Sequence, residues 1–182
     1  ILKKIDPTNL SNLSNLIKRS FLLKIPYRFF AQSIISYDFP SHLFIETTSA
    51  CNLKCKMCAR TNRKTLIGHM DFGLFKKIID EANNYGPRTF SLHLVGEPLL
   101  APNFSQMIKY IKRVNQNNTI LLTTNGTLLN QELGQTIIEA PVDKIYISFA
   151  SAEKNNYQEM TGADKLETVE KNVLDFIELK KR

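Results

Sequence analysis

The chain has 182 residues, of which 43% are hydrophobic and 23% charged, and its formal net charge is +7. This composition is typical of a globular domain with a hydrophobic core, and it excludes a disordered or collagen-like chain. No apolar run is long enough to cross a bilayer, and the first residues do not resemble an export signal. Because the sequence begins at Ile1 rather than Met, we expect it to be part of a longer protein.

The basic side chains are concentrated in two segments. Residues 1–30 carry six Lys and Arg side chains and one acid, and residues 51–64 carry five basic side chains and no acid. A pI near 9.3 is compatible with nucleic-acid binding. However, the sequence has no recognition-helix pattern and no interleaved aromatic and basic stripe. The second basic segment also contains all three cysteines, where positive charge would offset that of thiolates.

Residues 1–41 are predicted to form a helical leader. Leu10, Leu13 and Ile17 recur at helical spacing until Pro26 interrupts the pattern. Aromatic and basic side chains near that proline allow two interpretations of the leader. We favour a helix that packs its apolar face on the following domain over a helix that contacts a membrane surface.

From residue 42 onward, strand and helix patterns alternate. Short apolar segments predict four strands, at residues 43–47, 90–95, 119–124 and 144–149. Amphipathic segments predict four helices, at residues 72–82, 104–114, 129–139 and from 166 to the end of the chain. This alternation indicates an α/β fold with a parallel sheet and right-handed crossovers, built from four β/α units.

Unusual residues follow the predicted strands, at the edge where parallel α/β folds bind their ligands. A cysteine-rich run follows the first strand, Gly96-Glu97-Pro98 the second and Asn125-Gly126 the third, and Ser148 lies near the end of the fourth. An Asn-Gly pair between apolar runs is typical of a β-hairpin. We favour a strand-to-helix turn instead, because the segment that follows fits a helix.

Cys51, Cys55 and Cys58 have the spacing C-x3-C-x2-C. Thiolates at this density are ligands for soft metals. A 4Fe-4S cluster usually takes four cysteines, so three would leave one iron open to an external ligand. A zinc site completed by His42 or His69 is an alternative. A disulfide is another, but it would need an oxidising compartment and would leave one thiol over.

This pattern resembles the radical S-adenosylmethionine (radical SAM) superfamily, whose hallmark is C-x3-C-x2-C after the first strand of a partial parallel (β/α) barrel. Gly96-Glu97-Pro98 resembles its Gly-Gly-Glu motif, with Val95 in place of the first glycine. Residues 124–126 and 147–150 resemble motifs of the branch that carries C-terminal SPASM or twitch extensions. The family barrel has six units, so residues 42–182 would be its N-terminal part, with about four units, truncated at the C-terminus.

The resemblance implies an enzyme of the oxidoreductase or maturase type. Cys51, Cys55 and Cys58 would bind a 4Fe-4S cluster, and S-adenosylmethionine would chelate the fourth iron. Reductive cleavage of this cofactor would give a 5′-deoxyadenosyl radical, which abstracts a hydrogen atom from a peptide, sugar or alcohol substrate. The resemblance also implies a flavodoxin- or ferredoxin-type electron donor. Unpaired thiols and a cluster that needs reducing surroundings suggest a cytoplasmic location.

The resemblance further implies contacts with S-adenosylmethionine, although it assigns no catalytic residue. Met57 would lie against the adenine, and the segment around Gly96, Glu97 and Pro98 would meet the methionine amino group. Asn125 would be a polar contact or a turn residue, and Ser148 would hydrogen-bond the polar end of the cofactor.

The chain also departs from the family pattern. Ala150 stands where the related branch has an Asp, and Met160 where an Arg often pairs with the cofactor carboxylate. Lys154 is a candidate replacement for that cation. His93 and Glu46 could face the barrel interior near the cofactor, although a structural role is the commoner one for such side chains.

A second hypothesis is a non-catalytic zinc or iron–sulfur module whose basic surface contacts nucleic acid or a membrane. The zinc form of this hypothesis predicts a colourless purified protein, whereas an iron–sulfur cluster would make the protein brown.

Overall fold

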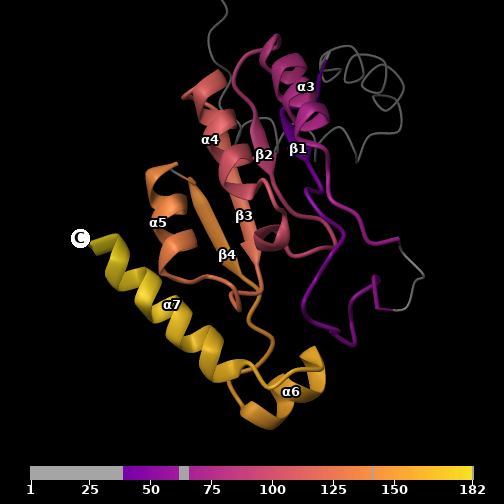
Figure 1. The fold of residues 1–182 in the computed structure, drawn as a ribbon, viewed down its shortest axis with the longest axis vertical. Coiled ribbons are helices and arrows are strands. Elements are labelled where there is room, and N and C mark those ends of the chain that lie inside the picture. Colours follow the sequence, from indigo (N-terminus) through magenta and orange to yellow (C-terminus); the bar gives the residue numbers. More distant parts are fainter. Residues whose placement is uncertain (1–38, 62–65, 141, 182) are drawn as a thin grey trace, which may run out of the picture. The chain divides into compact units, whose positions relative to one another are not determined.

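The structure, a computed structural model, describes residues 39–61, 66–140 and 142–181 (Figure 1). Four strands form one sheet in chain order: β1 (His42–Phe44), β2 (Thr89–Ser91), β3 (Thr119–Thr124) and β4 (Lys144–Ile147). All three neighbouring pairs are parallel. The predicted α/β class and its four parallel units are therefore confirmed. Residues 1–38 of the predicted leader lie outside the described residues, so the leader stays a prediction.

The four predicted helices are present, with the bounds α3 (Phe72–Asn83), α4 (Phe104–Val114), α5 (Gln131–Glu139) and α7 (Leu166–Lys181). Two elements were not predicted, the 3-10 helix η2 (Pro98–Leu100) and α6 (Lys154–Thr161). The α6 sequence is short and polar, and only Tyr157 and Thr161 are buried, so it has little of the apolar periodicity that marks a helix. Among the described residues, no helix is both long and apolar enough to span a membrane.

Capping side chains and apolar spacing in the sequence explain where these helices begin and which of their faces are buried. Asp71 Oδ1 accepts a 2.9 Å hydrogen bond from Leu74 N at the start of α3, and Asn130 Oδ1 accepts one of the same length from Leu133 N at the start of α5. Each side chain satisfies a backbone donor that the helix itself leaves unpaired. In α4 the buried apolar residues recur every three or four positions, namely Phe104, Met107, Ile108 and Ile111.

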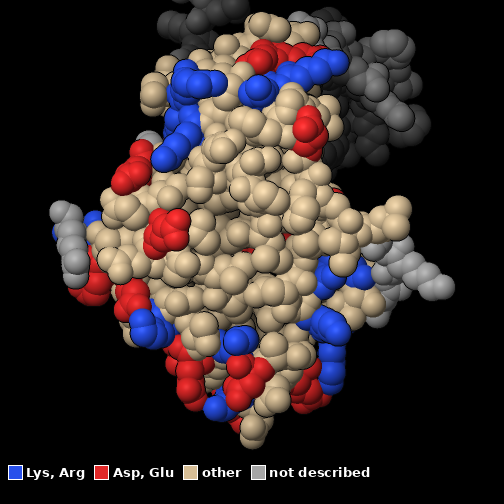
Figure 2. All heavy atoms as spheres, in the orientation of Figure 1, with Lys and Arg blue, Asp and Glu red and all other residues tan. Residues whose placement is uncertain are grey.

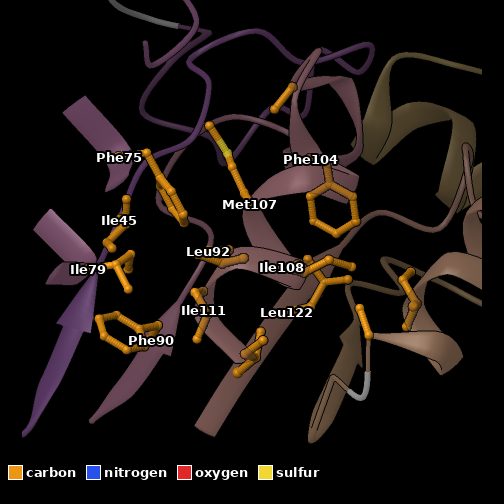
Figure 3. Close-up of a cluster of buried hydrophobic side chains, with 14 of the residues drawn as sticks. Ile45, Phe75, Ile79, Phe90, Leu92, Phe104, Met107, Ile108, Ile111 and Leu122 are labelled. Carbon is orange, nitrogen blue, oxygen red and sulfur yellow. The ribbon is translucent and has the colours of Figure 1, made fainter. Parts of the chain in front are cut away.

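The main core lies between one face of the sheet and helices α3 and α4 (Figure 3). Alternate strand residues point into it, as the neighbours Phe90 and Ile120 show, because successive side chains of a strand face opposite ways. The other face of the sheet carries exposed aromatic side chains, with Phe44 58% and Tyr146 52% exposed. Within the part of the chain that the structure describes, helices cover one face of the sheet, and we call the other its uncovered face.

The first two strands are shorter than predicted, because beyond Ile45 the backbone hydrogen bonds of the strand ladder are replaced by other partners. Ile45 N still donates to Ser91 O, at 2.8 Å. Beyond it, Glu46 Oε1 accepts from Val95 N at 3.1 Å, and Thr47 O accepts from Met70 N at 2.9 Å. Side-chain and loop partners thus replace the strand ladder here.

The Asn125-Gly126 turn connects a strand to a helix and not two hairpin strands. β3 pairs in parallel with both β2 and β4, and α5 follows the turn. Gly126 has φ +76°, a left-handed conformation that other residues adopt at a cost. The Asn-Gly pair by itself would also suit a hairpin, and the helical pattern of the segment after it is what correctly predicted the strand-to-helix turn.

A partly buried ion pair lies at the amino ends of the strands, at the edge of the sheet opposite the cysteines. Lys112 Nζ in α4 donates to Asp143 Oδ2 (2.8 Å) and to Asn118 O (2.7 Å), and Asp143 Oδ2 also accepts from Ile120 N. Burial alone would raise the pKa of Asp143, but the hydrogen bonds from Lys112 and Ile120 lower it below its ordinary value. The pair therefore links α4, β3 and the start of β4.

We expect Lys112→Met to lower the free energy of unfolding by about 1–3 kcal/mol, because it leaves an acceptor and a carboxylate without their cation. Lys109→Met, in the same helix, is the matched control. Its ammonium lies 4.0 Å from Glu139 at the surface, where an ion pair contributes less than about 1 kcal/mol. Urea unfolding measures both changes, and equal effects would contradict a special role for Lys112.

Candidate functional site

The cysteine loop, residues 49–68, leaves the sheet after β1 and returns before α3. It closes at an antiparallel bridge between Thr48 and His69, where Ser49 N donates to Gly68 O at 3.0 Å. Thr48 Oγ1 and Ser49 Oγ add further bonds to the Gly68 carbonyl. The described part of the loop is therefore held at its neck. This loop extends beyond the carboxyl end of β1, at the lower right of Figure 1.

Helix α6 holds the middle of the cysteine loop. Lys54 N donates to Thr161 O (3.0 Å), and Lys56 N donates to Met160 O (2.9 Å). The ammonium of Lys56 also pairs with Glu159 at 2.8 Å. The backbone on both sides of Cys55 is thus bonded to the C-terminal end of α6. Sequence analysis did not find this support, because its partners are more than 100 residues apart.

Gly96 allows the segment that follows β2 to pack closely against the start of the cysteine loop. A Cβ atom built on Gly96 would lie 1.9 Å from Thr48 O and 2.9 Å from Ala50 O. The next residue, Glu97, donates its backbone N–H to Ala50 O at 2.7 Å. The close approach that the glycine permits here is therefore to the residues just before Cys51.

The Glu97 carboxylate is buried, with 3% of the residue exposed, and it is bonded to the protein. Its Oε1 accepts from Thr124 Oγ1 (2.6 Å) and Leu99 N (3.2 Å), and its Oε2 accepts from Asn125 N (2.8 Å). Burial raises the pKa of this carboxyl, and the hydrogen bonds only partly oppose the rise. Glu97 thus bonds the segment that follows β2, at the start of η2, to the end of β3. Pro98 is buried beside it as the first residue of η2.

Asn125 connects the end of β3 to the first cysteine. Its Nδ2 donates to Asn52 Oδ1 (2.9 Å) and lies 3.9 Å from Cys51 Sγ, while its Oδ1 accepts from Thr127 N (2.9 Å). Only 8% of Asn125 is exposed. The amide is therefore held in place beside the Cys51 thiol by bonds on both of its ends.

The structure thus brings most of the predicted site residues to one edge of the sheet. Glu97 contacts Asn125, Asn125 contacts Cys51, and Ser148 N donates to Thr124 O at 2.8 Å. Met57 lies on the same loop as the cysteines and is 61% exposed. The roles predicted for these residues in cofactor binding stay predictions.

The three cysteines are half-buried free thiols. Burial raises the pKa of Cys55, and the negative charges of Cys51 and Cys58 raise it further, while Arg60 acts in the opposite direction. Three thiolates at these positions therefore need added positive charge, which metal ions supply. The donor set fits an iron–sulfur cluster, in which each thiolate binds a different iron.

A single zinc ion makes a different demand on the site. It needs three or four ligands within about 2.0–2.3 Å of one point. Among the described residues, no three His, Cys, Asp or Glu side chains are grouped so as to hold a metal ion, and this holds for the three cysteines as they are placed here.

Lys154, which is expected to replace the cofactor-pairing Arg, and Arg60 of the cysteine loop both have other partners. Lys154 pairs with Glu167 at 2.9 Å and with Asp164 at 3.5 Å, so the proposed replacement for the missing Arg is already bonded to two carboxylates. Arg60 donates to the carbonyl of Leu53 inside the loop. On the face shown in Figure 2, Lys and Arg mix with Asp and Glu towards the two ends, and the middle is largely uncharged.

Two histidines lie on the uncovered face of the sheet near its first two strands. His42 Nε2 is 2.7 Å from Ser91 Oγ, and the His42 ring stacks on Phe44. Burial lowers the pKa of His93, whose Nδ1 is buried without a hydrogen-bond partner among the described residues. Glu46, the other residue predicted to face inward, accepts from Val95 N.

The raised pKa of Glu97 predicts a pH effect on folding. The folded state binds the proton more tightly than the unfolded chain, so this carboxyl stabilises the fold below its ordinary pKa. That contribution is lost as the pH rises through the raised value. The difference in unfolding free energy between wild type and Glu97→Gln should therefore fall as the pH rises through this window, measured by urea unfolding at several pH values.

Glu159→Gln is the control for this experiment. A hydrogen bond from Lys56 lowers the pKa of the exposed Glu159, so its small stabilising contribution has the opposite pH dependence and grows as the pH rises. A wild-type minus Glu97→Gln difference that does not change with pH would contradict the raised pKa.

The fold and the site together define a parallel β/α protein with a cysteine loop after its first strand. The segments that follow the next two strands hydrogen-bond to this loop. The chain belongs to the radical SAM superfamily, whose sequence profile matches residues 45–182. The resemblance seen in the sequence motifs is thus confirmed.

Curated relatives are similar over part of their length. The chain is 36% identical over 109 residues to the tungsten-containing aldehyde ferredoxin oxidoreductase cofactor-modifying protein of Pyrococcus furiosus, covering 59% of this chain and 30% of that protein. It is 31% identical over 127 residues to the GTP 3′,8-cyclase of Chlorobaculum tepidum, covering 70% and 38% respectively. The chain thus spans less than half the length of these relatives.

Solved structures share the fold. BtrN in complex with AdoMet and 2-DOIA matches with a TM-score of 0.58 and 27% identity, over 70% of this chain and 55% of that one. Native anSMEcpe with bound AdoMet matches with a TM-score of 0.66 and 25% identity, over 78% and 42%. These matches confirm the partial barrel architecture. The predicted SPASM or twitch extension stays a prediction.

Proposed function

We propose that this chain is the cofactor-binding part of a radical SAM enzyme. Cys51, Cys55 and Cys58 would hold a 4Fe-4S cluster, and S-adenosylmethionine would bind at the remaining iron. The chemistry supplied there is reductive cleavage of S-adenosylmethionine to a 5′-deoxyadenosyl radical that abstracts a hydrogen atom from the substrate. The observation that carries the proposal is the contact of Asn125, at the end of β3, with the first of three free thiols.

In this proposal the residues of the chain hold the cluster and S-adenosylmethionine in place, and the cofactors supply the reactive groups. Glu97 holds the segment between β2 and η2 against the end of β3, and Gly96 lets that segment pack against the loop at Thr48 and Ala50. We expect the backbone around Gly96 and Glu97, the amide of Asn125 and the hydroxyl of Ser148 to contact S-adenosylmethionine at this edge of the sheet. Met57, exposed on the loop, would cover the adenine.

We further propose that the substrate lies over the uncovered face of the sheet. That face carries the exposed rings of Phe44 and Tyr146 and the Nδ1 of His93, which has no hydrogen-bond partner among the described residues. By their printed names, the relatives include GTP 3′,8-cyclases and a cofactor-modifying protein, and a structural neighbour was solved with bound AdoMet and a Cp18Cys peptide. GTP and short cysteine-containing peptides are therefore the first substrates to test. A flavodoxin- or ferredoxin-type donor and a cytoplasmic location complete the proposal.

The experiment is anaerobic reconstitution with iron and sulfide, followed by dithionite and S-adenosylmethionine. We expect a brown protein that forms 5′-deoxyadenosine, with and without the candidate substrates. An intact 4Fe-4S cluster without any 5′-deoxyadenosine would contradict the proposed activity. A colourless protein that binds zinc, and nucleic acid with a steep salt dependence, would support the non-catalytic alternative instead.

A further inference from the structure

The side-chain amide of Asn125 directs a buried donor at the first cysteine. Asn125 follows β3 directly and is 8% exposed, so its polar groups need partners within the protein. Its Nδ2 atom carries two hydrogens. One is donated to Asn52 Oδ1 at 2.9 Å, and Cys51 Sγ lies 3.9 Å from the same nitrogen, in a long N–H···S hydrogen bond. The second hydrogen of the amide is therefore the one available to the thiol that we propose as a ligand.

A closed ring of hydrogen bonds fixes which way the Asn125 amide points. Asn125 Nδ2 donates to Asn52 Oδ1, Asn52 Nδ2 donates to Thr127 Oγ1 at 2.7 Å, and Thr127 Oγ1 donates to Asn125 Oδ1, also at 2.7 Å. The Asn125 Oδ1 atom accepts from the Thr127 backbone N–H as well, at 2.9 Å. Turning the amide over would set donor against donor and acceptor against acceptor. The oxygen therefore faces Thr127, and the nitrogen faces Cys51.

The backbone around Asn125 is held as well as its side chain. Asn125 N donates to the buried carboxylate of Glu97 at 2.8 Å. From α7, Asn172 Nδ2 donates to Gly126 O (2.9 Å) and to Thr127 O (3.1 Å). A donor that is fixed before charge arrives needs no reorganisation to stabilise that charge. The amide N–H is thus already oriented in the free protein.

We propose that the Asn125 amide donates a hydrogen bond to the Cys51 sulfur of the bound cluster and thereby raises the reduction potential of the cluster. The inference rests on the proposed function, because it requires a cluster at the three cysteines. Hydrogen bonds to the sulfurs help to set the potential of iron–sulfur clusters. Reduction adds negative charge to the cluster and its sulfurs, so the bond stabilises the reduced form more than the oxidised form. Asn125 acts here through Cys51, as a positioning residue, before S-adenosylmethionine binds.

The test compares the midpoint potentials of wild type and Asn125→Ser, each reconstituted anaerobically and titrated without S-adenosylmethionine. The serine oxygen can still accept from Thr127 N, as in the turns that Ser and Asn both form, but the side chain is one bond too short to replace Nδ2. At a fixed potential, Asn125→Ser should lower the ratio of reduced to oxidised cluster about threefold to tenfold, followed by electron paramagnetic resonance. That change corresponds to a midpoint about 28–59 mV more negative for one electron.

Asn172→Ala is the control for a purely structural role. It removes the two hydrogen bonds that α7 donates to the same turn, and it leaves the Asn125 amide and its contact with Cys51 in place. We expect this variant to unfold at a lower urea concentration than wild type, while its midpoint potential stays close to that of wild type. An equal shift of the midpoint in Asn172→Ala and Asn125→Ser would assign the effect to the turn and overturn the inference.

Thr127→Val tests the orienting ring without changing Asn125. It removes the Thr127 hydroxyl and keeps the backbone N–H, so the amide loses part of its support and the midpoint should move in the same direction by a smaller amount. An unchanged midpoint in a fully loaded Asn125→Ser protein overturns the inference and leaves the proposed function intact. If Asn125→Ser takes up no iron, an unchanged midpoint in Thr127→Val overturns it instead. If wild type itself takes up no iron, the proposed function fails and the inference fails with it.

Discussion

Cys55→Ala is expected to reduce cluster iron to background and to abolish 5′-deoxyadenosine formation. The chain has only three cysteines, so no other thiolate can replace the lost ligand. Cys55 is also the cysteine whose neighbours on both sides are bonded to α6, so no nearby side chain moves easily into its place. Iron and sulfide analysis and the visible spectrum measure the first effect, and chromatography of the reaction products measures the second.

Ala59→Ser is the matched control for this variant. Ala59 is an exposed residue of the same loop, next to Cys58, and a serine there alters the loop without touching a predicted ligand. It should load iron like wild type. The free Cys55→Ala protein should unfold within about 1 kcal/mol of wild type, because a small change at a half-buried loop position leaves the core intact. Wild-type iron content in Cys55→Ala would contradict the assignment of this ligand.

Gly96→Ala should have the second largest effect, because the added methyl group has no space. Its Cβ would meet two backbone carbonyl oxygens, Thr48 O at 1.9 Å and Ala50 O at 2.9 Å. Backbone at the neck of the cysteine loop cannot rotate away as a flexible side chain would. We expect the free energy of unfolding to fall by about 3 kcal/mol, at the upper end of the usual cost of overpacking. The hydrogen bond from Glu97 N to Ala50 O should break, and cluster loading should fall with it.

Gly68→Ala isolates this steric effect. Gly68 lies at the same neck, where its carbonyl accepts from Ser49 N, but nothing lies within 4 Å of an added Cβ. Its unfolding free energy and iron content should therefore stay near those of wild type. If Gly96→Ala has the same unfolding free energy and iron content as Gly68→Ala, then the segment after β2 does not pack against the loop as closely as described here. Urea unfolding of the free protein and iron analysis of the reconstituted protein provide both comparisons.

Hydrophobic spacing was sufficient to predict the central fold. Phe104, Met107, Ile108 and Ile111 mark one helix face, and β3 from Thr119 to Thr124 has the predicted bounds. The missed elements have weak local patterns. In α6 only two of eight residues are buried, and η2 is a single turn that begins at Pro98 beneath the Glu97 carboxylate. Their positions depend on contacts with distant segments, which short-range periodicity does not record.

The candidate site was predictable as a set of residues, but the interactions among them were not. The motif order pointed to Gly96, Glu97 and Asn125 near the cysteines, and the structure brings these residues together. The sequence analysis expected both Gly96 and Glu97 to act towards the cofactor. The structure shows that the Glu97 side chain bonds the start of η2 to the end of β3, and that Gly96 makes room for Thr48 and Ala50.

The sequence by itself determined the α/β class, the superfamily and the three thiol ligands that we propose, because these depend on residue type and spacing along the chain. Only the tertiary structure decided how the cysteine loop is held. The carbonyls of Met160 and Thr161, the carboxylate of Glu97 and the space beside Gly96 become relevant only when segments far apart in the sequence meet. The physical reason is that hydrogen bonds and excluded volume act over a few ångströms, and the chain brings these groups that close only by folding.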